Sequence, residues 1–308
     1  MSWDEDEIHR WLARAKRPST FVGSTGHDAA VVARPRGPLV TCLDQCIEGV
    51  HVAVDETPAA YGRKAANRAL SDLAATAATP RGLMLGLSAP PVKTTRWMHA
   101  VIEAVRRAAQ AVGADLWGGD LAAANGPARI SVTALGELER KGKPVGRDRA
   151  RAGQVVVCTG AVGGARAGRH LRFVPRVDAG KRLAAAGCTA MMDVSDGLAW
   201  DLYRLARAAG VRVELDEVPV HSDARRAART GDHTAVWHAL HDGEDHELVA
   251  TLSAAAAHRA LDAAARRGEH WVIIGRVRAG SGLHLMGSAA EGRPRRWTPA
   301  EGGYRHGG

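Results

Sequence analysis

The chain has 308 residues, of which 45% are hydrophobic, so it is long enough for two globular domains and too apolar to be disordered. Its formal net charge is +9, but the arginines are spread along Ala-rich segments, which favours a solvated basic surface and argues against a nucleic-acid-binding protein. The acidic start has no signal-peptide pattern, and no apolar run is long enough to cross a membrane, so we expect a soluble cytoplasmic protein without a membrane partner.

Hydrophobic periodicity in the first half of the chain alternates between the period of a strand and that of a helix. In chain order it predicts a helix over 5–16, strands over 28–33 and 38–47, a helix over 59–78, a strand over 83–87, a helix over 98–112, and strands over 115–117 and 130–138. Lys64, Arg68 and Asp72 are spaced by four on the second of these helices, so we expect them to share one face.

A stretch rich in Lys, Arg, Gly and Pro over 139–153 is the best candidate for a linker. We therefore expect an N-terminal domain over 1–140 and a C-terminal domain over 150–308. Beyond the linker the pattern predicts a turn over 193–197, helices over 198–209 and 253–267, and strands over 155–158, 211–215, 247–252 and 271–277. Helices and strands alternate in both halves, which predicts an α/β (α+β) fold.

Six aspartates lie next to Gly or Ser or at the ends of apolar runs, and they are the strongest functional signal: Asp28, Asp44, Asp72, Asp120, Asp193 and Asp196. Gathered carboxylates bind hard cations, and Mg2+ usually takes only a few of them while it keeps its other positions for water and substrate phosphates. The sequence has no Walker A loop, so nucleotide chemistry would depend on metal ions and not on a Gly-Lys-Ser/Thr cradle. This pattern favours phosphoryl transfer.

Each aspartate also has a purely structural interpretation. Asp196 opens a helix and taken singly is best explained as its N-cap, while Asp72 is an even choice between a cap and a cation ligand. Asp28 lies two residues after Gly26 and Asp120 directly follows a Gly pair, so both could form ordinary turns. All six together, at the ends of consecutive elements, are harder to explain as caps.

Three further segments are weaker signals. Residues 160–164 could bind a phosphate at a helix N-terminus, but without a Lys-Ser/Thr continuation we favour a tight structural turn. A lone histidine such as His51 is usually structural, although its place after the strand with Asp44 raises the case for a phosphate or substrate contact. The acidic turn over 242–247 could be a solvated loop.

Four motifs carry a family resemblance that runs from about residue 23 to residue 304. They are Leu70-Ser71-Asp72-Leu73-Ala74-Ala75, Gly118-Gly119-Asp120, Asp193-Val194-Ser195-Asp196-Gly197-Leu198 and Gly243-Glu244-Asp245-His246-Glu247-Leu248. In these motifs the chain resembles the thiamine-monophosphate kinases, within the superfamily of aminoimidazole ribonucleotide synthetase and selenophosphate synthetase. The resemblance implies the two-domain fold of that superfamily: an N-terminal α/β domain that forms a dimeric barrel with its twin, and a C-terminal α/β domain that closes over the nucleotide.

The resemblance also implies an activity and a role for each motif. The expected reaction is the ATP-dependent phosphorylation of thiamine monophosphate to thiamine diphosphate by a homodimer, with Asp44, Asp72 and Asp120 as catalytic residues. Several Mg2+ ions around the ATP phosphates would be bound by Asp28, Asp44, Asp72, Asp120, Asp193 and Asp196. ATP itself would be contacted by Gly119, Asp120, Arg147 and Ser195. Thiamine monophosphate would be contacted by His51, Glu244, Asp245 and Tyr304.

The chain departs from the family pattern at His27, Cys42, Leu43, Gln45, Ala69 and Leu121. These changes remove polar or acidic side chains but leave every expected carboxylate ligand in place. Two alternatives therefore stay open, namely a divergent superfamily member with another small substrate and a non-catalytic protein that binds a nucleotide or thiamine phosphate. Product formation from ATP, Mg2+ and thiamine monophosphate separates these alternatives.

Overall fold

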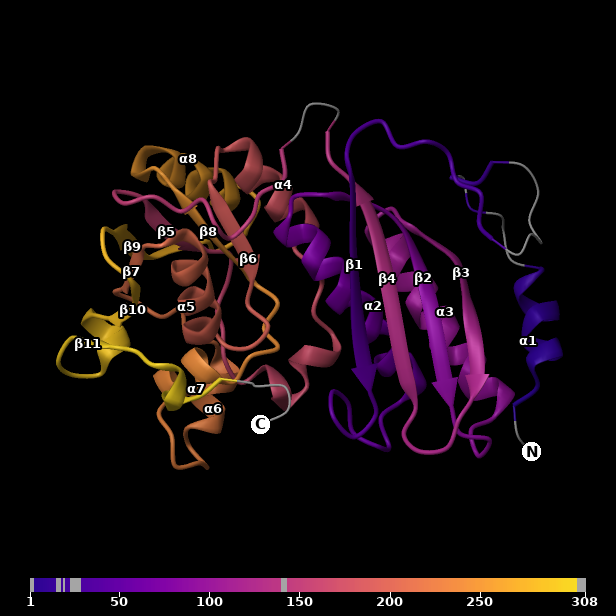
Figure 1. Ribbon diagram of the computed structural model, residues 1–308. Helices are drawn as coiled ribbons and strands as arrows, with labels where there is room; N and C mark the ends of the chain where they lie inside the picture. The colour runs from indigo at the N-terminus through magenta and orange to yellow at the C-terminus, as the bar shows by residue number, and fades with distance from the viewer. Residues whose placement is uncertain (1–2, 15–17, 19, 23–28, 140–142, 304–308) are drawn as a thin grey trace. The chain divides into compact units, whose positions relative to one another are not determined.

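The computed structural model describes residues 3–14, 18, 20–22, 29–139 and 143–303. The chain separates into two units, each with its own sheet (Figure 1). The first unit comprises residues 1–73 and 78–143, and the second unit comprises residues 74–77 and 144–308. The main boundary lies within the stretch 139–153 that is rich in Lys, Arg, Gly and Pro.

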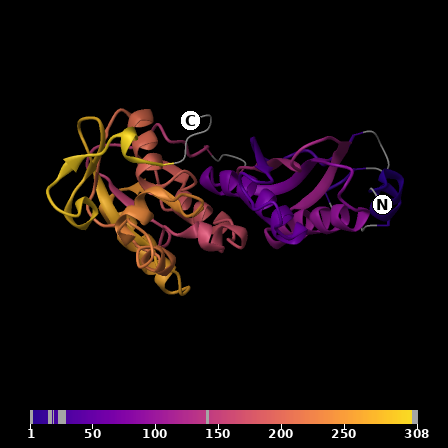
Figure 2. The same cartoon turned by 90° about the horizontal axis from the view of Figure 1, so that it is seen from below.

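The first unit is a four-stranded sheet with helices against one face (Figures 1 and 2). Its elements in chain order are α1 (Glu5–Leu12), β1 (Leu39–Ile47), α2 (Pro58–Ala75), β2 (Thr79–Ala89), α3 (Thr95–Ala111), β3 (Asp115–Ala123) and β4 (Arg129–Glu137). The strand order is β1-β4-β2-β3, in which β2 and β3 are parallel and the other two pairs are antiparallel. The edges of this sheet are therefore β1 and β3.

Alternation of burial along the strands fixes which side chains face the helices of the first unit. In β4 the side chains of Ile130, Val132 and Ala134 are fully buried, while the residues between them are only partly covered. On β1, Leu39 and Leu43 are 54% and 63% exposed, although both are large and apolar. One face of this sheet is thus packed against helices, and the other presents apolar side chains to solvent.

The second unit is a seven-stranded sheet in the order β11-β10-β7-β9-β5-β8-β6. Its strands are β5 (Val155–Cys158), β6 (Ala190–Asp193), β7 (Arg212–Leu215), β8 (Leu248–Leu252), β9 (Val272–Arg278), β10 (Gly282–Leu285) and β11 (Arg295–Arg296). Its α-helices are α4 (Val177–Ala185), α5 (Leu198–Ala209), α6 (Ser222–Ala227), α7 (Ala235–His241) and α8 (Ala254–Ala265). Its short 3-10 helices are η1 (Ala165–Ala167), η2 (Arg169–Leu171), η3 (Gly287–Ala290) and η4 (Pro299–Glu301).

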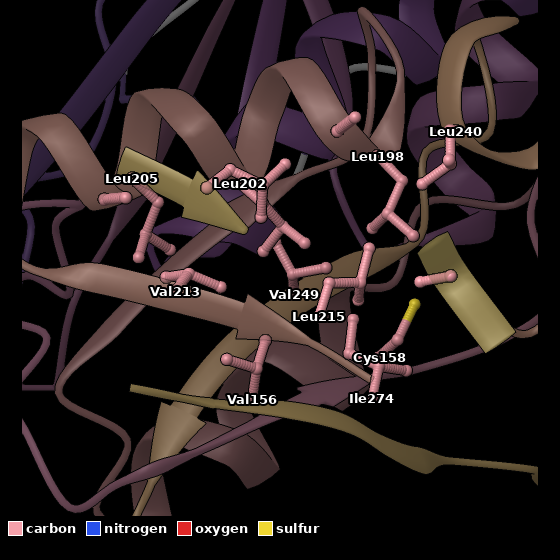
Figure 3. Close-up of a cluster of buried hydrophobic side chains, with 14 of the residues drawn as sticks. Val156, Cys158, Leu198, Leu202, Leu205, Val213, Leu215, Leu240, Val249 and Ile274 are labelled. Atoms are coloured by element: carbon pink, nitrogen blue, oxygen red, sulfur yellow. The ribbon is translucent and has the colours of Figure 1, made fainter. Parts of the chain in front are cut away.

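The core of the second unit forms where α5 packs on the sheet (Figure 3). Leu198, Leu202 and Leu205 recur at helical spacing and point from α5 toward β5, β7, β8 and β9. Gly210, at a φ of 64°, ends this helix in the left-handed conformation typical of a C-terminal cap. This packing places the N-terminal end of α5, and the turn before it, at the end of β6.

Most elements expected from periodicity are present, although several differ in their bounds. The strand expected over 83–87 spans Thr79–Ala89, and the helix expected over 59–78 ends at Ala75. Of the predicted strand 28–33, the described residues contain only an isolated bridge between Val32 and Phe21, because no neighbouring strand extends the pairing. The helix expected over 5–16 ends at Leu12, and the strand expected over 115–117 continues to Ala123. The short elements β6, β10, β11, α4, α6 and α7 were not predicted. Among the helices described, none combines the length and apolar character needed to span a bilayer.

Candidate functional site

Asp44 and Asp72 both lie near the Cys42 thiol in the first unit. Cys42 and Asp44 point to the same face of β1, toward α2, where the thiol donates a hydrogen bond to the Ala69 carbonyl at 3.2 Å. Burial raises the pKa of the Cys42 thiol, and the negative charges of Asp72 and Asp44 raise it further. The thiol is also within hydrogen-bonding reach of the Asp72 carboxylate. Two carboxylates from distant parts of the sequence therefore share one small volume.

Cations on α2 complete this cluster. Arg68, one turn before Asp72, binds both carboxylate oxygens of Asp44 at 3.2 and 3.4 Å. Lys64, one turn earlier, is buried and donates to the carbonyl of His51 at 2.5 Å. Lys64, Arg68 and Asp72 contact residues of β1 and of the turn after it, so they share one face of α2 as expected. The helix brings two cations and one carboxylate to the residues of β1 and the turn after it.

His51 lies in the turn that follows β1. Its Nδ1 accepts a hydrogen bond from the backbone N–H of Ile47 at 3.1 Å, so the ring proton is on Nε2 in the neutral state. Together with the bond from Lys64 to its carbonyl, this contact fixes the turn. At least part of the role of His51 is therefore structural.

Asp120 lies on the opposite edge of the first unit's sheet from Asp44. Across the sheet, Asp120 on β3 pairs with Gly86 on β2. Gly86 pairs with Ser131 on β4, which in turn pairs with Gln45 on β1. Three strand spacings separate β3 from β1, which amounts to about 14 Å between backbones. Within one copy of this unit, Asp120 is therefore not a neighbour of Asp44. The expectation that Asp120 lies at a strand end is also wrong, because β3 continues three residues beyond it.

Gly119 has a packing reason to be glycine. A Cβ at this position would lie 2.0 Å from the carbonyl oxygen of Leu85 on the neighbouring strand β2. Any side chain would therefore force β3 away from β2. Gly119 is exposed, so its backbone is also accessible from solvent.

In the second unit, the turn over 193–197 and the turn over 243–247 are joined backbone to backbone. Glu244 N donates to Ser195 O at 2.7 Å, His246 N donates to Val194 O at 2.8 Å, and Val194 N donates to Glu247 O at 2.8 Å. Glu244 and His246 have φ angles of 59° and 52°, in the left-handed region that costs an L residue roughly 1 to 2 kcal/mol. Two motifs that lie some 50 residues apart thus form one strained, tightly paired structure.

His246 lies between two carboxylates at this junction. Its Nδ1 is 3.2 Å from Asp193 Oδ2, and its Nε2 is 3.6 Å from Glu244 Oε2. Its ring stacks on Phe173 with centroids 4.0 Å apart. Burial alone lowers the pKa of His246, but the Asp193 and Glu244 carboxylates outweigh burial and raise this pKa to about 9. These two carboxylates therefore favour the protonated form of the ring.

A fully buried carboxylate, Asp201 on α5, holds the turn over 193–197 in place. Its Oδ2 accepts from the backbone N–H groups of Ser195 and Asp196, both at 3.0 Å. Burial raises the pKa of Asp201 well above its ordinary value, and the negative charges of Asp196 and Asp193 raise it further. Arg204 forms ion pairs with Asp196 and Asp201. Asp193, Asp196 and Asp201 thus lie within electrostatic range of one another.

The spacing from Asp196 to Asp201 is the sequence signal that could have identified Asp201 as the anchor of this turn.

The other acidic residues of the 242–247 turn point toward the Gly-rich segment 160–164. Asp245 Oδ1 accepts from Gly163 N and from Arg169, each at 2.8 Å, and its side chain has no exposed surface. Glu247 binds Arg176 at 2.5 and 2.9 Å and accepts from the Thr159 hydroxyl at 2.6 Å. Residues 160–164 lead into only one turn of 3-10 helix, in agreement with the tight-turn interpretation. In this unit Asp245 is an anchor of the loop.

The remaining expected site residues are placed as follows. Arg147 is exposed and follows Gly146, which pairs with Ala190 at the start of β6. Asp28 and Tyr304, together with His27 beside the first of them, lie outside the described residues.

The carboxylate groups fit Mg2+ by their chemistry. Among the residues that the structure describes, no group of three or more His, Cys, Asp or Glu side chains converges closely enough to hold an ion alone. Asp44 and Asp72 both lie within electrostatic range of Cys42, and Asp193 and Asp196 both lie within electrostatic range of Asp201. Mg2+ normally takes one or two carboxylates and completes its shell with water and substrate phosphates. Each pair therefore suits a Mg2+ ion that binds together with a nucleotide.

The chain matches known families and proteins over most of its length. The N-terminal domain model of AIR synthase related proteins matches residues 26–138, and the C-terminal domain model matches residues 130–288. The thiamine-monophosphate kinase of Rhodopirellula baltica is 37% identical over 244 residues, which are 75% of this chain and 76% of that protein. The thiamine-monophosphate kinase of Mycobacterium tuberculosis is 34% identical over 263 residues, which are 79% and 78% of the two chains.

Solved structures of the same fold cover nearly the whole chain. The crystal structure of thiamine-monophosphate kinase from Stenotrophomonas maltophilia is 31% identical, covers 93% of this chain and 98% of its own, and has a TM-score of 0.79. A structure of AaThiL complexed with AMPPCP and TMP is 26% identical, covers 98% and 95%, and has a TM-score of 0.76. The hydrogenase maturation protein HypE of E. coli, at 18% identity and a TM-score of 0.78, shares the fold. The chain belongs to the thiamine-monophosphate kinase family of AIR synthase related proteins.

Proposed function

We propose that this chain is an ATP-dependent kinase that phosphorylates thiamine monophosphate to thiamine diphosphate. The observation that carries the proposal is the near full-length likeness to AaThiL complexed with AMPPCP and TMP, because that protein binds an ATP analogue and thiamine monophosphate on the same fold. Two of the motifs shared with the family, residues 193–197 and 243–247, are also joined to each other by three backbone hydrogen bonds.

The acceptor in this reaction is itself a phosphate and is already ionised at neutral pH. No strong general base is therefore required, and the demands on the protein are alignment of the two substrates and compensation of their negative charge. Mg2+, when bound, neutralises charge on the phosphates. The residues of the chain serve by holding these ions and by orienting the acceptor.

In the first unit we assign Mg2+ binding to Asp44 and Asp72, with Asp28 as a further ligand. Both Asp44 and Asp72 face the Cys42 thiol, so they offer oxygen donors at one place. His51, in the turn fixed by Lys64, is proposed to contact thiamine monophosphate.

In the second unit we assign Mg2+ binding to Asp193 and Asp196, and an ATP contact to Ser195. The buried carboxylate of Asp201 supports this assignment, because it fixes the backbone of Ser195 and Asp196. Arg147 is exposed and is proposed to contact the ATP phosphates. Glu244 and Tyr304 remain the proposed substrate contacts of this unit. Asp245, expected as a third contact, has no exposed side-chain surface and is proposed to hold the turn in place.

We further propose that the active form is a cytoplasmic homodimer. The uncovered sheet face of the first unit presents Leu39 and Leu43, at 54% and 63% exposed, which is typical of a surface that another chain covers. Gly119 and Asp120 lie on the edge strand farthest from Asp44. A second copy offers the means to bring Asp120 to the Mg2+ and ATP site from the partner chain.

One assay tests the proposed function. The full-length protein is incubated with ATP, Mg2+ and thiamine monophosphate, and thiamine diphosphate is measured by chromatography. Product that appears with ATP and Mg2+, and is absent when either is omitted, is the expected result. Calorimetry that detects ligand binding without any turnover would instead favour the non-catalytic binding protein.

A further inference from the structure

His246 is the residue of the 243–247 turn that faces the proposed Mg2+ ligand Asp193. It belongs to a family motif, but the resemblance assigns it no role. Its side chain is 3% exposed and separates two carboxylates from different turns, Asp193 at 3.2 Å from Nδ1 and Glu244 at 3.6 Å from Nε2. Within the described part of the chain, Nε2 has no hydrogen-bond partner. Nε2 is buried and lies 3.6 Å from the Glu244 carboxylate, so a small movement of that carboxylate would form a hydrogen bond between them.

The turn has two chemically different sides. Asp245 and Glu247 bind the segment 160–164 and its neighbours, so they anchor the turn. Glu244 and His246 alternate with them: His246 faces Asp193, and Glu244 faces His246. The anchoring side explains how the turn tolerates the positive φ angles of Glu244 and His246, because its hydrogen bonds leave the backbone no other conformation.

The orientation of the His246 ring is fixed from three directions. Phe173 stacks on its face at 4.0 Å, with an angle of 14° between the ring planes. Its own backbone N–H is bound to Val194 O at 2.8 Å. The third contact is with Asp193 itself. A ring held this firmly can orient a carboxylate, since a donor on one carboxylate oxygen determines where the other oxygen points.

We propose that His246 is a positioning residue for the kinase reaction, in which its Nδ1 orients Asp193 toward Mg2+ and its Nε2 orients Glu244 toward thiamine monophosphate. The proposal rests on the proposed function, since it takes the roles of Asp193 and Glu244 from it. Residues that orient a metal ligand from behind typically change metal affinity or activity about 10- to 100-fold when they are replaced. His246 thereby links the nucleotide side of the site with the acceptor side.

Two amide substitutions separate the two contacts. In His246→Asn the amide nitrogen takes the place of Nδ1, so the contact with Asp193 is kept and the contact with Glu244 is lost. In His246→Gln the amide nitrogen takes the place of Nε2, so the contact with Glu244 is kept and the contact with Asp193 is lost. Thr251→Val is the matched control, because it removes buried hydrogen bonds at the other end of the β6–β8 pair.

Two readouts are measured on the full-length protein. Mn2+ affinity, in the presence of a non-hydrolysable ATP analogue, is measured from the electron paramagnetic resonance of free Mn2+. The KM for thiamine monophosphate is measured from product formation. We expect His246→Gln to weaken Mn2+ binding about tenfold or more with little change in this KM, and His246→Asn to raise the KM about tenfold with nearly normal Mn2+ binding.

Equal Mn2+ affinity in the two amide variants, or losses no greater than those of Thr251→Val, would overturn the proposal and leave His246 as a packing residue. The proposed function fails separately, if the wild-type protein makes no thiamine diphosphate. In that case the difference in Mn2+ affinity between His246→Gln and His246→Asn still decides whether His246 orients Asp193.

Discussion

Arg68 binds both carboxylate oxygens of Asp44, with its Nε 3.4 Å from Oδ2 and a terminal nitrogen 3.2 Å from Oδ1. The two side chains are 13% and 23% exposed. Asp44 is one of the carboxylates proposed to bind Mg2+, so the guanidinium and the metal ion compete for the same oxygens. This chain therefore carries its own cation at a position proposed for a metal ion.

Removing that cation should make Mg2+ easier to bind. We expect Arg68→Ala to lower the Mg2+ concentration for half-maximal turnover roughly fivefold, because a partly exposed ion pair contributes about 1 kcal/mol. The measurement is a Mg2+ titration of product formation at saturating ATP. Arg68→Lys keeps the charge but loses the two-pronged contact, and it should fall between wild type and Arg68→Ala. An unchanged Mg2+ requirement in Arg68→Ala would contradict the competition.

Asp72→Asn should lower turnover about 100-fold or more while the fold stays intact. The carboxylate is proposed to hold Mg2+ against the phosphates, and a neutral amide cannot replace that charge. Turnover, circular dichroism and thermal unfolding are measured together. Asp178→Asn is the control, because the Asp178 side chain is 85% exposed and pairs with nearby Lys181 on α4. Near-normal turnover in Asp72→Asn would remove this residue from the site.

The sequence predicted the long, strongly periodic elements because their burial follows a single face. Leu198, Leu202 and Leu205 are buried at helical spacing, and the predicted helix 198–209 is confirmed residue for residue. The short elements β6 and α7 lacked enough residues to show a period. For β3, the Gly pair before Asp120 predicted a strand end, but pairing with β2 continues through it because β2 extends equally far.

Motifs gave the candidate site residues, but they could not distinguish anchors from ligands. Asp245 and Glu244 are adjacent in one motif, yet Asp245 turns toward Gly163 and Glu244 toward His246. The alternation depends on positive φ angles, which nothing in a Glu or His residue predicts. Likewise, the pairing of Arg68 with Asp44 joins two elements 24 residues apart and depends on how α2 packs on β1.

A charge on the uncovered sheet face should prevent dimer formation. We expect Leu43→Asp to convert a dimer into a monomer, since Leu43 is 63% exposed in the single chain and an unpaired carboxylate would be buried in the interface. Size-exclusion chromatography with light scattering measures the change. Val92→Asp, at an apolar position that is 81% exposed in the turn after β2, is the matched control and should leave the assembly unchanged. A wild-type protein that is monomeric would refute the homodimer.

Gly243→Ala should destabilise the protein more than Gly210→Ala. Both glycines are in the left-handed region, with φ angles of 69° and 64°, so both substitutions cost roughly 1 kcal/mol in backbone strain. At Gly243 the new Cβ would also lie 2.6 Å from the Ser195 carbonyl oxygen, whereas at Gly210 it would meet nothing within 4 Å. Urea unfolding measures the difference. Equal losses would show that the two turns can separate without cost.

The stability of the metal-free protein should fall as the pH rises toward 9, and His246 should account for part of the fall. Its pKa is raised from 6.5 in the unfolded chain to about 9 in the folded protein, where the Asp193 and Glu244 carboxylates outweigh burial. The imidazolium therefore stabilises the fold fully below pH 6.5, and this contribution, about 3 kcal/mol at most, is lost as the pH passes through 9.

Urea unfolding at pH 6 and at pH 10, with a chelator present, tests the role of this histidine. His246→Gln carries no titrating group at this position, so its free energy of unfolding should change less between the two pH values than that of wild type. The comparison with the variant is needed because burial also raises the pKa of Asp245 to about 7, which lowers stability as the pH rises toward 7 in both proteins. Parallel pH profiles for the two proteins would show that the pair of carboxylates around His246 does not stabilise its charge.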